Sequence, residues 1–293
     1  MILRIISAFF FSLLIVACSS QNHEKLKVSS STWIGYSPLF YAKEQGWLKP
    51  FNIELLNVVS LSENVYLYEA GNSDAFVGTQ YEYNLVAQKK HSLMPVIMFD
   101  RSYGGDLIMA NVSIKELQET NSTIDVYLEM DSINKTLIEY FTNKYHLDNK
   151  KIRYINQDQT QISTLNAKNI KHPIIVVTYI PYNQVLQKQG FKELVSTKDG
   201  LDIFVVDAMF TTTETFHEHK EQFIELKKMI NKALVVLKND PHHFYESVKP
   251  YMNNISYDEF NASLNDIIWV NDNLSQELIQ RLKEVAFPTR DLI

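Results

Sequence analysis

Hydroxyl, aromatic and carboxylate side chains follow the predicted strands of this chain, at the points where binding sites lie in α/β proteins. In an open sheet of parallel strands, ligands bind beyond the carboxyl ends of the strands, beside helix N-termini. Hydroxyls and carboxylates at these points would hydrogen-bond a solute, and aromatic faces would grip a flat or cationic group. The candidate ligand-binding residues are Trp33, Tyr36, Ser62, Thr79, Tyr81, Asp100, Ser102, Glu129, Ser132 and Tyr179.

Several of these candidates have a structural alternative that the sequence leaves open. Trp33 could cap the core of a sheet, and Ser62 could be the N-cap of the helix that follows it. Tyr36 and Tyr81 are two of 16 tyrosines, so packing is an equally natural use for each of them. A helix N-cap also leaves backbone N–H groups free for an anion, so the capping and binding interpretations of Ser62 are compatible.

Catalytic and metal sites are not predicted. His217, Glu218 and His219 lie at the start of a predicted helix, where neighbouring residues point in different directions. The pair His242 and His243 follows a proline at another helix start and is typical of a solvated face. The sequence contains no glycine-rich phosphate loop and no serine in a nucleophile elbow. We therefore expect no enzyme activity, no cofactor and no metal.

The elements that must position the candidates alternate between strands and helices. Short apolar or alternating runs predict the strands, and capped segments ended by glycine predict helices between them. This alternation predicts α/β architecture with a mainly parallel sheet covered on both faces. The predicted strands are 26–30, 53–59, 75–77, 94–99 and 107–110, then 124–128, 152–155, 173–177 and 201–206. Helices are predicted at 216–237, 241–252, 257–267 and 275–285.

The N-terminus has the layout of a secretory signal peptide. Arg4 precedes an apolar run from Ile5 to Ala17, which is too short to span a bilayer as a helix. The next residue, Cys18, is the only cysteine, and the segment resembles a bacterial lipobox, in which that cysteine is lipidated. We predict a signal peptide at 1–17 and a polar tether at 18–25. We therefore expect an exported protein that its lipid holds at a membrane, in the periplasm or at the outer face of the cell membrane.

The composition limits the partners. Apolar residues make up 45% of the chain and aromatic residues 12%, which favours a well-filled globular interior. The formal net charge is −6 and no basic block is present, so no nucleic-acid partner is expected. A single cysteine permits no intrachain disulfide, so packing must supply the stability. We expect a monomer.

Several segments, in order, resemble a known family. The segment 33–46, with the sequence WIGYSPLFYAKEQG, is similar to the opening of periplasmic substrate-binding proteins of the nitrate, sulfonate, taurine and thiamine-pyrimidine type. The segments 71–75, 100–106, 177–182 and 239–241 resemble later stretches of that family in the same order. The resemblance implies the type II periplasmic-binding-protein fold, in which a second α/β lobe is inserted into the first.

The inserted lobe defines the predicted domain boundaries. Lobe one is predicted at 26–104 and 205–293, and lobe two at 105–204. Gly104 and Gly105 stand between two predicted strands at the first crossing, where we expect a hinge, although a tight turn is the alternative. The resemblance implies the solute-binding component of an ABC importer, which captures a small organic solute and delivers it to a membrane permease. A ligand-sensing subunit of a membrane receptor or signalling enzyme is the alternative.

The class of solute is less defined by the sequence. A sulfonate or nitrate site needs N–H donors and usually a cation, and Arg101 is the only arginine near the predicted cleft. Asp100, Glu129 and Asp131, together with several aromatics, favour a neutral or cationic solute such as a pyrimidine or an amine. Specificity cannot be transferred from the family, because Thr178 and Tyr179 replace residues that many of its members carry.

Overall fold

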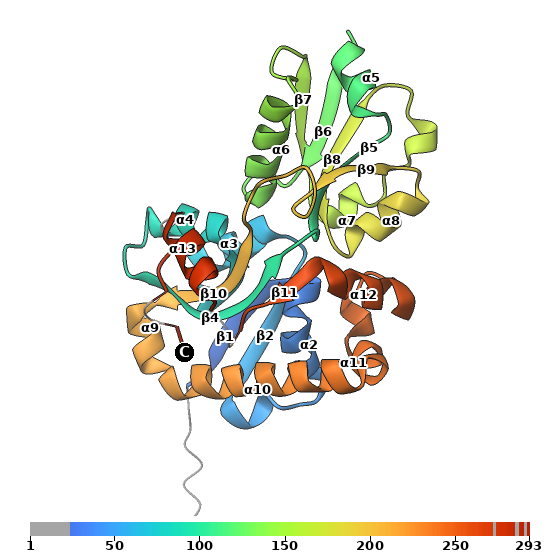
Figure 1. Ribbon diagram of the computed structural model, residues 1–293. Coiled ribbons are helices and arrows are strands. Elements are labelled where there is room, and N and C mark those ends of the chain that lie inside the picture. Colours follow the sequence, from blue (N-terminus) through green and yellow to red (C-terminus); the bar gives the residue numbers. More distant parts are fainter. Residues whose placement is uncertain (1–23, 272–273, 285–286, 290–291) are drawn as a thin grey trace, which may run out of the picture.

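The computed structural model describes residues 24–271, 274–284, 287–289 and 292–293. It contains two α/β lobes, each built on its own sheet, which lie one above the other in Figure 1. The two-lobe α/β architecture predicted from the sequence is confirmed. The prediction of a mainly parallel sheet is wrong, because β10 and β11 in lobe one and β5 in lobe two pair antiparallel with their neighbours. The predicted signal peptide and Cys18 lie outside the described residues. Within the described part of the chain, no helix combines the length and apolar character needed to cross a membrane.

Lobe one, the lower lobe in Figure 1, contains a six-stranded mixed sheet in the order β11-β4-β10-β3-β1-β2. β1 pairs in parallel with β2 and β3, and β10 runs antiparallel between β3 and β4. The carboxyl ends of β1, β3 and β4 and the beginning of β10 therefore meet at one edge of the sheet. The strands are β1 Leu26–Ser31, β2 Ile53–Val58, β3 Ala75–Thr79, β4 Leu93–Ser102, β10 Val206–Thr212 and β11 Ile267–Trp269.

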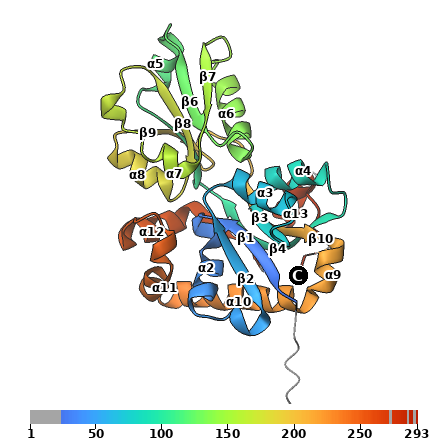
Figure 2. The same ribbon diagram turned by 180° about the vertical axis from the view of Figure 1, so that it is seen from behind.

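The helices of lobe one cover this sheet and build its base (Figure 2). The long helix α10 packs against α2 and α11 and buries an apolar face that includes Phe223, Leu226 and Ile230. The α-helices are α2 Ser37–Glu44, α3 Leu61–Glu69, α4 Gln80–Ala87, α9 Thr213–Glu218, α10 Lys220–Asn239, α11 Pro241–Val248, α12 Tyr257–Ser263 and α13 Gln276–Glu284. Short 3-10 helices are η1 Ile34–Tyr36, η2 Lys49–Phe51, η4 Lys249–Tyr251 and η5 Leu264–Asp266.

Lobe two contains a five-stranded sheet in the order β7-β6-β8-β5-β9. All six residues of β8 are buried, as expected for a central strand covered on both faces. Helix α6 covers one face and buries Leu137, Ile138 and Phe141, which share one side of the helix. The elements are β5 Asp106–Ala110, β6 Ile124–Leu128, β7 Ile152–Asn156, β8 Ile174–Tyr179, β9 Lys192–Ser196, α5 Ile114–Glu119, α6 Ile133–Lys144, α7 Gln159–Ile162, η3 Ala167–Asn169 and α8 Tyr182–Lys188.

Two crossings join the lobes, and they lie against each other. The first runs from β4 to β5 through Gly104, whose φ of +120° favours glycine. The second runs from β9 to β10 and carries Thr197, whose hydroxyl accepts a hydrogen bond from the Gly104 amide at 2.8 Å. The same hydroxyl lies 2.9 Å from the Ser102 hydroxyl. These polar contacts hold the two crossings together at one place.

Three predicted elements differ from the structure. The apolar run at 201–206 was predicted as the last strand, but β10 begins at Val206 and continues to Thr212. The helix predicted at 216–237 is interrupted at His219, between α9 and α10. The N-cap of α3 is Ser60, whose side chain accepts from the Glu63 amide at 3.0 Å, so the capping role predicted for Ser62 was wrong.

The capping of α3 gives a matched pair of variants. Ser60→Ala removes the acceptor for the Glu63 amide, so we expect the free energy of unfolding to fall by about 1 kcal/mol. Ser62→Ala, two residues along, removes no cap and should change it by less than about 0.5 kcal/mol. Urea denaturation followed by circular dichroism measures both values. Equal losses for the two variants would contradict the assignment.

Candidate functional site

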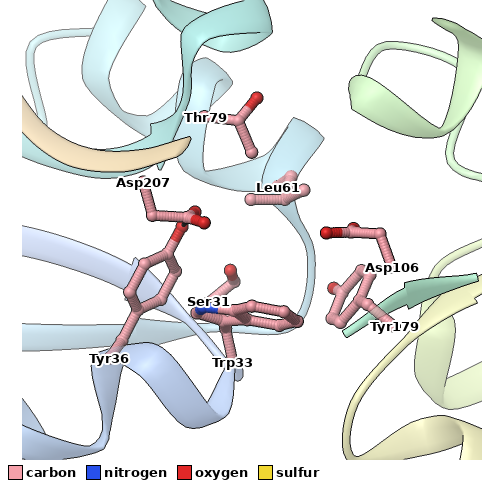
Figure 3. A pocket seen from close by; sticks show the side chains of 8 residues that line it. All are labelled: Ser31, Trp33, Tyr36, Leu61, Thr79, Asp106, Tyr179 and Asp207. Atoms are coloured by element: carbon pink, nitrogen blue, oxygen red, sulfur yellow. Dashed lines mark hydrogen bonds between the residues drawn. The ribbon is translucent and has the colours of Figure 1, made fainter. Parts of the chain in front are cut away.

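A small enclosed cavity lies between the lobes, where the strand ends of both sheets face each other (Figure 3). Its volume is about 10 Å³, which is room for a single water-sized group. Both lobes contribute to its wall, because Asp106 and Tyr179 come from β5 and β8 of lobe two. The lining residues are Ser31, Trp33, Tyr36, Leu61, Thr79, Asp106, Tyr179 and Asp207.

Trp33 is held in place by close packing after the end of β1. Its indole Nε1 donates to both carboxylate oxygens of Asp100, at 3.2 and 3.3 Å. Glycine is required beside this contact, because a Cβ at Gly35 would lie 2.0 Å from Asp100 Oδ2. A Cβ at Gly105 would lie 2.4 Å from Trp33 Cη2. The indole also meets the Tyr179 ring edge-on, with ring centroids 6.0 Å apart.

Five buried carboxyl groups surround or line the cavity, and we call them the acidic cluster. Its members are Glu82, Asp100, Asp106, Glu129 and Asp207, each at most 4% exposed. Asp100 and Asp207 are direct partners across the β4–β10 ladder, an arrangement in which two like charges repel. The Tyr36 hydroxyl donates a hydrogen bond to Asp207. The Ser102 hydroxyl lies next to Asp106 and hydrogen-bonds its carboxyl group.

Among the described residues, no lysine, arginine or histidine forms an ion pair with the acidic cluster. Burial without a cation disfavours the ionised form. Burial therefore raises the pKa of Glu129 to about 8 and that of Asp106 to about 7, and the Glu82 charge adds to both shifts. Burial also raises the pKa of Asp100 and of Asp207 well above the usual range. Neighbouring carboxylates raise the pKa of both groups further.

Two members of the acidic cluster bridge the lobes, and we call them the capping carboxylates. Glu82, on α4 of lobe one, accepts from the amide of Ile133 at the start of α6 in lobe two, at 3.0 Å. Glu129, in lobe two, accepts from the amide of Leu61 at the start of α3 in lobe one, at 3.1 Å. The Tyr179 hydroxyl donates to Glu129 at 3.3 Å. Each lobe thus supplies a carboxyl group to a helix N-terminus of the other.

The structure brings together most of the residues predicted for the site. Trp33, Tyr36, Thr79 and Tyr179 line the cavity. Four other predicted residues are buried but are not part of the cavity lining: Asp100, Ser102, Glu129 and Ser132. Ser62 and Tyr81 are half-buried and also lie outside the lining. Ser132 is the N-cap of α6.

Arg101, which the sequence left as a candidate partner for an anion, lies away from the cavity. Its guanidinium stacks on Phe204 at 4.8 Å and lies 5.9 Å from the Tyr103 ring centroid. No arginine lines the cavity.

The sequence prediction did not include Leu61, Glu82, Asp106 or Asp207 among the site residues. Asp207 was missed because the strand was predicted to end at Val206, one residue before it. Glu82 had a readable signal, since Thr79 and Glu82 have the spacing of a capping box, and the structure contains that box. The same carboxyl group that closes the box reaches across to lobe two.

Comparison with known proteins supports the fold. No protein-family model matches the sequence, and no curated protein matches it. The ligand-binding component of an ABC-type import system from Staphylococcus aureus, with zinc bound, matches with a TM-score of 0.69 at 13% identity, over 90% of this chain and 91% of that one. The alkanesulfonate-binding protein SsuA from Xanthomonas axonopodis pv. citri matches with a TM-score of 0.68 at 12% identity, over 92% and 98%. The chain therefore has the type II periplasmic-binding-protein fold.

A third match extends the set to inorganic anions. The nitrate-binding protein NrtA from Synechocystis PCC 6803 matches with a TM-score of 0.61 at 12% identity, over 81% of this chain and 69% of that one. Sequence identity at this level carries no ligand from one protein to another.

The raised pKa of Glu129 predicts how stability depends on pH. The folded protein keeps the proton that the unfolded chain releases near a pKa of 4.5, so the stabilisation is present below that pH and is lost as pH rises towards about 8. Glu129→Gln stays neutral, so the free energy of unfolding should fall less steeply over this range than in the wild type. Urea denaturation across the range measures the slope.

Asp148→Asn is the control for this measurement, because Asp148 is an exposed carboxylate of lobe two. It should leave the slope unchanged. A slope in Glu129→Gln as steep as that of the wild type would show that Glu129 does not hold a proton in the folded state.

Proposed function

We propose that this protein is the lipid-anchored solute-binding component of an ABC importer. One observation supports this most strongly: strand ends of both lobes, which carry aromatic, hydroxyl and carboxyl side chains, converge on one buried cavity at the crossing between the lobes. Ligands of open α/β sheets bind at this kind of position. Closure of two lobes around a ligand is a recurrent transition of such folds.

The contacts across the cleft form only when the lobes meet. The capping carboxylates contribute one interlobe hydrogen bond each, and Lys188 of α8 pairs with Glu259 of α12 at 2.7 Å on the outer side. A solute that touches both lobes adds to these contacts and shifts the population towards the closed form. A shift from 1:99 to 99:1 needs about 5.5 kcal/mol of differential binding.

The size of the cavity makes opening part of the function. A volume of about 10 Å³ accepts one water-sized group, so the lobes must open before an organic solute can enter. Entry, closure and release would then be rotations about the two crossings at Gly104 and Thr197. The permease would receive the solute when the lobes separate again.

Export and anchoring rest on the N-terminal sequence. The apolar run that ends at Ala17 and the single cysteine that follows it support processing before Cys18 and lipid attachment there. A thioether-linked lipid of two acyl chains would hold the folded lobes at a membrane surface. The tether at 18–25 would separate the lobes from that surface.

Removing one capping carboxylate should open the lobes. Glu129→Ala deletes the acceptor for the Leu61 amide and for the Tyr179 hydroxyl. The loss of about 1–3 kcal/mol corresponds to about a fivefold to 150-fold decrease in the closed-to-open ratio. Small-angle scattering should report a larger radius of gyration than for the wild type.

Glu116→Ala is the matched control, because Glu116 caps α5 within lobe two and makes no contact across the cleft. It should leave the radius of gyration unchanged. An unchanged radius in Glu129→Ala, with folding intact, would contradict the proposed closure.

Lipid attachment gives a separate test. Cys18→Ser should move the protein from the membrane fraction to the soluble fraction, and Ser20→Ala should leave it in the membrane fraction. Mass spectrometry of the N-terminal peptide identifies the modification. Retention of Cys18→Ser in the membrane would overturn the anchor.

The importer role is tested by capture of the partner from membranes. Crosslinking in cells, solubilisation in detergent and affinity purification of this protein should recover a permease and its ATPase. Recovery of a receptor or signalling enzyme in their place would favour the sensing alternative.

A further inference from the structure

The hydrogen-bond donors at the cavity are already committed to carboxyl groups. Trp33 Nε1 donates to Asp100, and the Tyr36 hydroxyl donates to Asp207. Thr79 Oγ1 donates to Glu82 at 2.6 Å. An anion such as a sulfonate or nitrate needs free N–H or O–H donors, and the lining side chains supply almost none.

One amide at each of two helix N-termini beside the cavity is also occupied. Glu82 accepts from the first amide of α6, and Glu129 accepts from the first amide of α3. These amides are the groups that would otherwise hold an anion at this fold position. The chain fills these anion sites with carboxyl groups, which become acceptors for a cation that displaces their protons.

Ser31 is the lining side chain that has no partner. Its hydroxyl oxygen is fully buried and makes no hydrogen bond among the described residues. It points from the end of β1 into the cavity, towards the space between Asp207 and Asp106 (Figure 3). A buried, unpaired hydroxyl costs free energy, and a ligand that hydrogen-bonds to it would remove that cost.

We infer that the solute carries a cationic ammonium group, which enters this cavity between Ser31, Asp106 and Asp207. This inference rests on the proposed function, and it names the chemical class of the solute. A primary ammonium group is water-sized and carries three N–H donors, which matches one hydroxyl and two carboxylates as acceptors. The rings of Trp33, Tyr36 and Tyr179 line the same cavity, and aromatic rings attract a cation.

An organic cation fits these acceptor groups better than a metal ion does. No three histidine, cysteine, aspartate or glutamate side chains within the described ranges converge in a way that could hold a metal. Asp106 and Asp207 instead come from different lobes and approach the cavity from opposite sides (Figure 3). An ammonium group bridging them would join lobe two to lobe one.

Binding of a cation should release protons. The carboxyl group of Asp106 faces Glu82, Asp100, Asp207 and Tyr179, and no base of the described residues is paired with it. Burial holds its pKa at about 7, so part of the unliganded protein carries a proton there near neutral pH. An ammonium ion favours the carboxylate, and the proton passes to the buffer.

The test uses the wild-type protein and compounds matched in shape but different in charge. The amines are butylamine and 2-phenylethylamine, the neutral partners are butanol and 2-phenylethanol, and the anions are butanesulfonate and 2-phenylethanesulfonate. We expect at least one amine at millimolar concentration to raise the melting temperature and its neutral and anionic partners to leave it unchanged. Calorimetry in phosphate and in HEPES, neither of which is a primary amine, should give different binding enthalpies, because protons are released.

A variant pair locates the site. Asp207→Asn should weaken binding of the amine by about tenfold or more, since a hydrogen bond to a charged group is lost. Asp148→Asn, on the exposed surface of lobe two, should leave the affinity unchanged. If Asp207→Asn fails to fold, the comparison of amines with neutral and anionic compounds on the wild-type protein still tests the inference.

The outcomes separate the ligand class from the proposed function. Binding of a sulfonate, of a neutral partner or of zinc chloride, without binding of either amine, overturns the ammonium site and leaves a solute-binding protein. Equal binding of amines by wild type and by a folded Asp207→Asn also overturns it. Absence of any binding across the set, with no change in small-angle scattering, counts against both.

Discussion

Burial of carboxyl groups without a counter-cation is the constraint on which the rest of this structure depends. Removing one charge from water costs several kcal/mol unless it is paired, and the acidic cluster contains five such groups. The chain meets this cost with hydrogen-bond donors and with protons. The raised pKa values of Asp106 and Glu129 follow from that arrangement. The orientations of Trp33 and Tyr36 follow from it too, because the indole Nε1 and the phenol hydroxyl each donate a hydrogen bond to a carboxyl group.

The acidic cluster divides into two parts with different physical roles. Glu82 and Glu129 face backbone amides of the opposite lobe, and they act on the relative position of the lobes. Asp100 and Asp207 are neighbours across one ladder, where their mutual repulsion is relieved only by protonation or by a positive charge nearby. The first pair links the two lobes in this arrangement. The second pair is stabilised by the Trp33 and Tyr36 donors together with protonation or a nearby positive charge.

Much of the fold could be predicted from the sequence, because hydrophobic periodicity and glycine stops mark most strands and helices. The strand ends also gave the general position of the site, so Trp33, Thr79 and Tyr179 were predicted among its residues. Asp207 could not be predicted, because the apolar segment before it resembles a strand. In the structure this segment crosses between the lobes, and Leu201 and Val205 are apolar because they are buried there. The hydrogen bond from the Ile133 amide to Glu82 could not be predicted either, because it depends on the position of lobe two relative to lobe one.

The packing of Trp33 against Gly105 has a practical consequence. The indole touches the first crossing through Gly105, the ring of Tyr179 in lobe two and the carboxyl group of Asp100 in lobe one. Any rotation of one lobe against the other must therefore change the polarity and quenching around this ring. The other tryptophans, Trp47 and Trp269, are half-buried in lobe one, away from the cavity lining. The protein thus contains a native fluorophore beside the first crossing, which would report any rotation of the lobes without an attached dye.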